Sequence, residues 1–186
     1  MEVKYKLEQA PRKTCIALGF FDGVHLGHQE VIKNTVQKAR QTSIIPTVLT
    51  FLQNPKSIVK NIEIKRIITQ TQKENLLKKL GIELLYAVNF LEIKELTPEA
   101  FVEQILVDML QAKYIFCGFN FRFGKGATAT AKDLKSLCQK HAVNAQIIPP
   151  ICIDNEPVSS TRIRSLIAEG NVKLADTLLG KNLDKK

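Results

Sequence analysis

The amino-acid sequence predicts an α/β fold, with a mostly parallel sheet of five or six strands and helices on both faces. Two patterns predict it. Apolar runs of strand length alternate with segments whose apolar residues recur at helical spacing, which is typical of βαβ units. The runs are nearly continuous in apolar residues, as expected for strands that helices cover on both sides. Ligands of such sheets bind at the carboxyl ends of the strands.

The elements follow one another with recognisable start and stop signals. The expected strands are 15–21, 44–51, 83–88, 113–118 and 146–150. The expected helices are 27–40, 69–80, one beginning at 97–99, 131–141, one running from Ser159 or Ser160 to 169, and 172–179. Thr97 is a suitable N-cap with Pro98 in the first helical position, and Gly81 is a suitable C-terminal stop.

Two stretches between these elements lack a clean period. Residues 52–65 contain the turn signal Asn54-Pro55, and we interpret them as a mobile flap over the site. Residues 154–157 are expected to form a turn.

Length and composition predict a single globular domain over residues 1–186. No apolar run approaches the length of a membrane span, and no signal peptide opens the chain. The four cysteines form no Cys-x-x-Cys pair, and three of them lie in apolar strand-like runs. We therefore expect reduced, buried thiols and a cytoplasmic protein.

The net charge of +9 is compatible with three kinds of partner, namely nucleic acid, an anionic membrane and phosphorylated small molecules. The lysines are spread along the chain rather than grouped, so a solvated surface accounts for most of the excess. Aromatic residues make up only 6% and do not interleave with a basic stripe. We expect neither a nucleic-acid nor a membrane partner, and a monomer or weak oligomer.

A glycine-rich stretch, GFFDGVHLGH, lies between the first expected strand and the first expected helix. Such a turn offers free backbone N–H groups and the positive end of a helix dipole to an anion. Gly19, Gly23 and Gly27 let the backbone bend and let a phosphate come close. His25 and His28 are three residues apart and face the same side of a helical first turn.

Two other interpretations of the two histidines stay open. One is a surface turn that happens to hold two of the chain's three histidines. The other is a metal site, which is disfavoured because no third cysteine and no carboxylate cluster stands at ligand spacing.

A second anion-binding pattern opens the helix near residue 160. Hydroxyls of Ser159, Ser160 and Thr161 can cap the helix and also donate to phosphate. Arg164 lies one turn further on the same side, and its guanidinium can bind phosphate oxygens in a forked manner. The alternative is an ordinary cap with a solvated arginine. Arg162 lies on a different face, from which it would contact a nucleotide from the loop side.

Three segments in order carry a specific resemblance: FFDGVHLGH at 20–28, FNFRFG at 119–124 and SSTRIR at 159–164. They resemble the FAD synthetase (FMN adenylyltransferase) module of prokaryotic riboflavin kinase/FAD synthetases, over residues 15 to about 180. The resemblance implies a Rossmann-like nucleotidylyltransferase fold. It also implies transfer of AMP from ATP to FMN, giving FAD and pyrophosphate, with Mg²⁺ as cofactor.

The same resemblance implies roles for residues of the first segment. His25 and His28 would contact the ATP phosphates, with His28 nearest the transferred phosphoryl group. Backbone of the surrounding turn would form the ATP and FMN pocket; its residues are Gly19, Phe20, Phe21, Asp22, Gly23 and Gly27. For Asp22 a second role is open, because its carboxylate can hold the turn as an Asx cap.

Roles in the other two segments follow in the same way. Asn120 would help to hold Mg²⁺ and the phosphates, and Phe121, Arg122 and Phe123 would line the flavin side. A core position for the two phenylalanines is the alternative. Ser159, Ser160, Thr161 and Arg162 would bind substrate, and Arg164 would act on the phosphates. The sequence departs from the family pattern at Gln53-Asn54 and after Lys125, so flavin contacts there are not carried over.

Three other functions remain open. A related nucleotidylyltransferase would use another phosphate acceptor, such as phosphopantetheine, nicotinate mononucleotide or glycerol phosphate. A non-catalytic flavin or nucleotide sensor would have lost its chemistry, and a basic RNA-binding module is the weakest candidate. We also expect no riboflavin kinase domain in these 186 residues, and a frayed polar tail at 182–186.

Overall fold

The computed structural model describes residues 1–180, so the expected polar tail at 182–186 lies outside the described residues. Six parallel strands form the central sheet, in the order β1-β4-β3-β2-β5-β8. They are β1 (Glu2–Lys4), β2 (Thr14–Leu18), β3 (Ile45–Phe51), β4 (Leu84–Val88), β5 (Ala112–Gly118) and β8 (Asn144–Ile148). The expected α/β class with a parallel sheet of five or six strands is confirmed.

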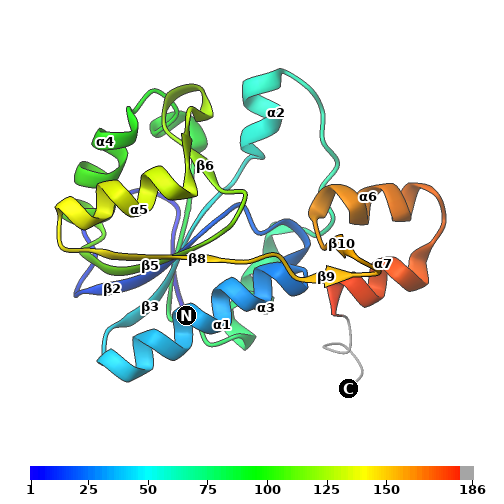
Figure 1. Cartoon of the computed structure of the whole chain (residues 1–186), viewed down its shortest axis with the longest axis horizontal. Coiled ribbons are helices and arrows are strands. Elements are labelled where there is room, and N and C mark those ends of the chain that lie inside the picture. The colour runs from blue at the N-terminus through cyan, green and yellow to red at the C-terminus, as the bar shows by residue number, and fades with distance from the viewer. Residues whose placement is uncertain (181–186) are drawn as a thin grey trace.

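Helices cover both faces of this sheet (Figure 1). On one face lie α1 (Leu26–Thr42) and α3 (Gln70–Lys79), and on the other α4 (Pro98–Ala100), the π-helix η3 (Phe101–Met109) and α5 (Ala131–Lys140). Successive strand residues point to opposite faces. In β2, Cys15 and Ala17 therefore join the cluster under α1 and α3, whereas Ile16 and Leu18 join the cluster under η3 and α5.

The C-terminal part forms a separate small cluster beside the sheet (Figure 1). It contains the hairpin β9 (Cys152–Ile153) and β10 (Glu156–Pro157), followed by α6 (Ser160–Ala168) and α7 (Val172–Leu179). Gln29 of α1 ties this unit to the main body, because its side-chain amide donates to the carbonyls of Val24 and Leu179, each at 3.0 Å. Gly180 completes the joint, since a Cβ there would lie 2.8 Å from Leu26.

The five expected strands and the helices expected between and after them are present, with bounds that differ by at most three residues. Thr97 caps α4 as expected, through a bond from the Ala100 N–H at 3.2 Å. Several short elements were not expected: β1, α2 (Pro55–Lys60), the pair β6 (Arg122–Phe123) and β7 (Ala129–Thr130), the turns η2 (Phe90–Glu92) and η4 (Lys125–Ala127), and the β9–β10 hairpin. They are too short to show a period, and β1 lies at the sheet edge.

Three of the four cysteines are buried, but they are not the three that lie in apolar strand-like runs of the sequence. Cys15, Cys117 and Cys138 are buried and free, and burial raises the pKa of each thiol to about 12. Cys138 lies in α5, whereas the strand residue Cys152 is exposed in the hairpin. Within residues 1–180, no helix is both long enough and apolar enough to span a membrane.

Candidate active site

The site lies at the carboxyl edge of the sheet, where β2 ends in a tightly wound turn. Phe21, Gly23 and Val24 all have positive φ, at 55°, 82° and 43°. The turn passes through η1 (Asp22–Val24) and delivers His25 to the start of α1. Non-glycine residues with positive φ are strained, and such strain accumulates at functional sites.

Packing, rather than room for a ligand, explains why position 19 is glycine. Phe21 is 1% exposed, and a Cβ on Gly19 would lie 2.9 Å from the Cζ of its ring. At Gly23 the positive φ is the decisive requirement, and Ile67 and Leu179 also close around it. Gly19 and Gly23 therefore let the turn fold over Phe21, and the close approach of a phosphate to Gly19, Gly23 and Gly27 stays a prediction.

His25 and His28 stack on one another, as their spacing predicted. Their ring centroids are 3.5 Å apart with an interplanar angle of 18°, and the Phe21 ring packs edge-on against His28 at 5.2 Å. His25 is the N-cap of α1, because its Nδ1 accepts a hydrogen bond from the His28 N–H at 3.3 Å. Both imidazoles thus stand at the positive end of a 17-residue helix.

Both imidazoles are neutral at pH 7. Burial lowers the pKa of His25 to about 4, although the negative charge of Asp22 acts to raise it. Burial also lowers the pKa of His28 well below 6.5, and the nearby charges of His25 and Lys73 act in the same direction. The Nδ1 atom of His28 is buried and has no hydrogen-bond partner within residues 1–180. A buried polar atom without a partner marks a place where a ligand or solvent completes the structure.

Asp22 connects three parts of the chain through its carboxylate. Oδ2 accepts a hydrogen bond from Arg164 Nη2 at 2.8 Å, and Oδ1 accepts one from the Ile67 N–H at 3.0 Å. Arg164 also donates from Nε to the Lys65 carbonyl at 2.9 Å. Neither side-chain bond of Asp22 closes its own turn. The Asx-cap role is therefore wrong, and the carboxylate anchors Arg164 and the end of the flap instead.

The start of α6 meets the same turn. Ser159 caps the helix by accepting from the Arg162 N–H at 3.2 Å, and Ser160 donates from Oγ to the Asp22 carbonyl at 2.9 Å. Thr161 is exposed in the first turn of α6.

Arg162 contacts the β9–β10 hairpin instead. It donates to the carbonyls of Ile153 and Glu156, and it pairs with the carboxylates of Glu156 and Asp154. These contacts tie Arg162 to the β9–β10 hairpin, and a contact with a nucleotide stays a prediction.

The segment after β5 divides between surface and core. Asn120 is exposed and its side chain has no partner among the described residues. Phe123 is 7% exposed and packs in the core against Phe101, with ring centroids 5.5 Å apart. This burial favours the core alternative for Phe123. Phe121 stacks on Phe123 at 5.8 Å and stays half-buried, and Arg122 is exposed.

These residues leave the sheet at one edge. Leu18 of β2 pairs in register with Cys117 of β5, so the turn at Phe20 and the segment at Asn120 both follow the same edge. Hydrogen bonds join Asp22 to Ser160 and Arg164, and ring stacking joins His25 to His28. The two groups belong to the same turn, and the charge of Asp22 acts on His25. No contact within residues 1–180 joins Asn120 to either group.

Sequence patterns missed one buried cation at this edge, Lys73 of α3, which is 4% exposed. It lies three residues before the apolar stripe of its helix and carries no motif, so only its place on the buried side of α3 could have indicated it. Arg66 was also missed; its guanidinium donates to the Leu52 carbonyl and closes the base of the flap.

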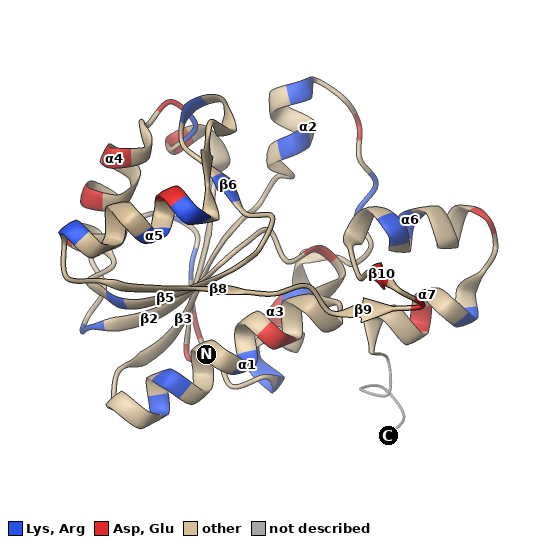
Figure 2. Ribbon diagram, in the orientation of Figure 1, with Lys and Arg blue, Asp and Glu red and all other residues tan. Residues whose placement is uncertain are grey.

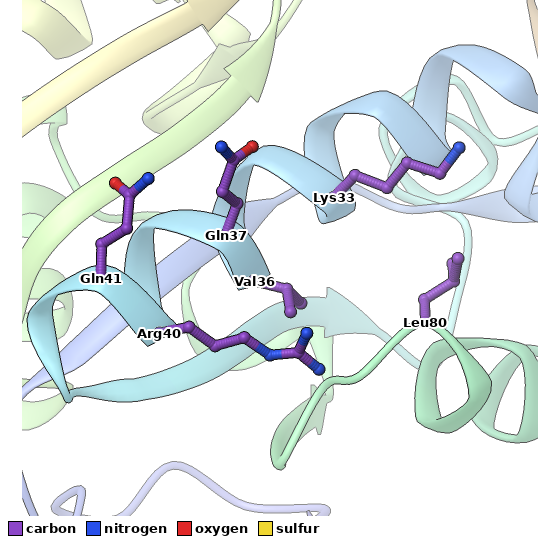
Figure 3. A pocket seen from close by; sticks show the side chains of 6 residues that line it. All are labelled: Lys33, Val36, Gln37, Arg40, Gln41 and Leu80. Carbon is purple, nitrogen blue, oxygen red and sulfur yellow. The ribbon is translucent and has the colours of Figure 1, made fainter.

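Positive side chains are scattered over the molecule, and some of them surround this edge. Figure 2 shows Lys and Arg on α2, which directly follows β3, on the chain returning from α2, and on α6. The surface groove in Figure 3 is separate from this site. It is formed by the C-terminal half of α1 and the end of α3, and its lining residues are Lys33, Val36, Gln37, Arg40, Gln41 and Leu80.

Comparisons with known proteins place the chain in a family. A family model described as FAD synthetase matches residues 7–162. A bifunctional riboflavin kinase/FMN adenylyltransferase from Listeria monocytogenes is 37% identical over 168 residues, which are 89% of this chain and 53% of that protein. An FAD synthetase from the same species is 34% identical over 172 residues, covering 91% of this chain and 69% of the relative.

Solved structures show the same fold. A Streptococcus pneumoniae protein named macrolide-efflux protein has a crystal structure that superposes with a TM-score of 0.85 at 33% identity, covering 96% of this chain and 60% of that one. The chain spans about half the length of the bifunctional relatives it matches. From the family model, the relatives and the fold together, this chain belongs to the FAD synthetase family.

Proposed function

We propose that the chain is an FMN adenylyltransferase, which transfers AMP from ATP to FMN and releases pyrophosphate. The observation that carries the proposal is the stacked pair of neutral imidazoles, His25 and His28, at the N-terminus of α1. Family membership supplies the substrates, since the relatives are named for FMN adenylylation.

The chemistry needs no strong base. A phosphate oxygen of FMN attacks the α-phosphorus of ATP, and the bond from that phosphorus to the oxygen bridging to the β-phosphate breaks. The nucleophile is already an anion, so the protein must align the two phosphates and stabilise charge on the α-phosphate and the leaving pyrophosphate. A neutral imidazole with a depressed pKa suits this task. It donates one N–H to a phosphate oxygen, and it is a weak base that does not take up a second proton at pH 7.

Contacts within the protein orient Arg164 for this role. Asp22 and the Lys65 carbonyl hold Nη2 and Nε, and Nη1 has no partner among the described residues. The guanidinium can therefore donate to a phosphate oxygen without releasing Asp22. An arginine held on one side and open on the other is preorganised, which reduces the cost of binding.

The proposal includes Mg²⁺, with ligands supplied mainly by the phosphates of ATP. Within residues 1–180, no group of three His, Cys, Asp or Glu side chains could hold a metal ion by itself. Mg²⁺ is commonly bound through substrate phosphates with few protein ligands. Asn120, with its free amide oxygen at the same sheet edge, fits as one such ligand. Bound there with ATP, the ion would neutralise charge on the phosphates.

We propose a monomer or weak oligomer as the active form. Free cysteines suit a reducing compartment, and we place the reaction in the cytoplasm. FMN and ATP are the proposed partners.

The test is incubation of the protein with ATP, Mg²⁺ and one of several acceptors, followed by chromatography of flavins and detection of pyrophosphate. FMN should yield FAD and pyrophosphate in equal amounts. Phosphopantetheine, nicotinate mononucleotide and glycerol phosphate should yield no pyrophosphate above background. Product from one of them, with none from FMN, would show that the acceptor is wrong. Tight nucleotide binding without turnover would instead support a sensor.

Riboflavin with ATP provides a further arm of the same assay. Its hydroxyl must lose a proton to become a nucleophile, and the imidazoles here are poor bases because burial depresses their pKa. We expect these 186 residues to give neither FMN nor FAD from riboflavin. Appearance of FMN would contradict this reading of the site.

A further inference from the structure

Lys73 is a buried ammonium directly behind the turn that carries the histidine motif. The residue is 4% exposed, and no salt bridge involves its ammonium in the part of the chain that the structure describes. A buried cation without an ion-pair partner is costly, so it persists where its charge has a use. The mechanism above does not employ it.

The three N–H bonds of the ammonium all go to the carboxyl ends of two strands. Nζ donates to the carbonyl of Phe20 at 3.2 Å, to the carbonyl of Phe51 at 3.3 Å and to Thr50 Oγ1 at 3.3 Å. Thr50 in turn donates to the same Phe20 carbonyl at 2.9 Å. The ammonium also lies 4.7 Å from the centre of the Phe20 ring. One carbonyl, that of Phe20, thus receives two hydrogen bonds.

Fixing this carbonyl fixes the N–H on the other side of the same peptide. The peptide is trans, so the Phe21 N–H points away from the oxygen that Lys73 binds. Neither the Phe20 N–H nor the Phe21 N–H donates to another group within residues 1–180. These donors belong to the strained turn, immediately before Asp22 and the histidines.

We propose that Lys73 is a positioning residue of the phosphate site, which orients the Phe20–Phe21 peptide so that its N–H faces the bound polyphosphate. The inference rests on the proposed function, because it names the anion that the oriented N–H receives. The charge of Lys73 also lies behind that N–H and adds positive potential at the site. Its effect is already visible on His28, whose pKa it helps to lower.

Protonation of Lys73 gives the proposal a pH signature. Burial is the largest cause that lowers its pKa to about 8. The charged groups that face it are Arg66, which lowers the pKa further, and Asp22 and Glu74, which raise it. His28, from α1, is neutral in this range. As pH rises from 7 to 9, Lys73 therefore loses its proton and the Phe20 carbonyl loses a charged donor.

The experiment compares Lys73→Met and Lys73→Arg with Lys78→Met, a matched control on the exposed side of the same helix. At pH 7 we expect kcat/KM for ATP to fall at least tenfold in K73M and to change less than twofold in K78M. Between pH 7 and 9, kcat/KM should fall in the wild type and in K78M. It should stay flat in K73M and in K73R, because neither new side chain titrates there.

Calorimetric titration with inorganic pyrophosphate supplies a readout that does not depend on flavin chemistry. Its affinity should drop at least tenfold in K73M and recover in part in K73R, which keeps the positive charge. Circular dichroism and urea unfolding establish that each variant is folded. If K73M does not fold, the wild-type and K73R pH profiles decide the question, since only the wild type should lose affinity near pH 8.

Two results would overturn the inference. One is a K73M variant that matches K78M in kcat/KM and in pyrophosphate affinity, and the other is a wild-type profile without a change near pH 8. Failure of the proposed function is distinguishable from both. In that case the wild type would make no FAD, whereas the pyrophosphate titration would still report on Lys73.

Discussion

Acid should destabilise this protein through His25, by an amount that the structure allows us to calculate. The folded pKa of His25 is about 4, whereas an unfolded histidine has a pKa of about 6.5. Between these values the unfolded state binds more protons, so stability is full above pH 6.5 and is lost as pH falls toward 4. The whole difference is worth ~3 kcal/mol, and ~2 kcal/mol of it is lost between pH 7 and pH 5.

The matched variant is His25→Asn, which removes the titrating group and keeps the cap. Asparagine at the N-cap can accept from the His28 N–H as the imidazole now does. Urea unfolding of both proteins at pH 7, 6 and 5 gives the free energy of unfolding at each pH. The wild type should lose about 2 kcal/mol more than the variant between pH 7 and pH 5. The difference reports the loss of the His25 imidazole together with its effect on the stacked His28.

Parallel losses in the two proteins, equal within about 0.5 kcal/mol, would refute this reasoning. They would mean that the folded protein accepts a proton on His25 near pH 6.5. The imidazole would then be hydrated rather than buried against His28. A positively charged His25 would also require a different account of how the site binds phosphate.

Three further predictions concern the site. His28→Ala should lower turnover by roughly 10²–10³-fold, the scale for losing one preorganised donor, with little effect on unfolding; near-normal FAD formation would remove His28 from the site. Arg164→Lys should clearly lower kcat/KM for ATP, because an ammonium lacks the planar fork with which the guanidinium holds Asp22 and the Lys65 carbonyl while Nη1 stays open; wild-type kinetics would mark Arg164 as structural. Asp22→Asn should cost about 1–3 kcal/mol in urea unfolding, since a buried charged acceptor becomes neutral, and an unchanged midpoint would argue against the Asp22–Arg164 bond.

Within the site, the sequence alone indicated residues whose role is encoded locally. His25 and His28 share one helical turn, so their spacing was enough to predict that the rings lie together. Ser159 could be predicted as a cap for the same reason. The role of Asp22 could not, because its partners Ile67 and Arg164 are 45 and 142 residues away. Which acceptor a carboxylate meets across such distances depends on packing.

The sequence also determined the fold class, because the spacing of apolar residues within each segment indicates by itself whether that segment forms a strand or a helix. Strand order, the short elements and the use of Lys73 were decided only by tertiary structure. Lys73 lies in α3 like any helical lysine, and its place behind the Phe20 carbonyl arises because α3 packs under the ends of β2 and β3. For Phe123 the motif left a flavin contact and a core position open, and the structure buries its ring in the hydrophobic core. Contacts between distant segments follow from burying apolar surface together, which no local pattern records.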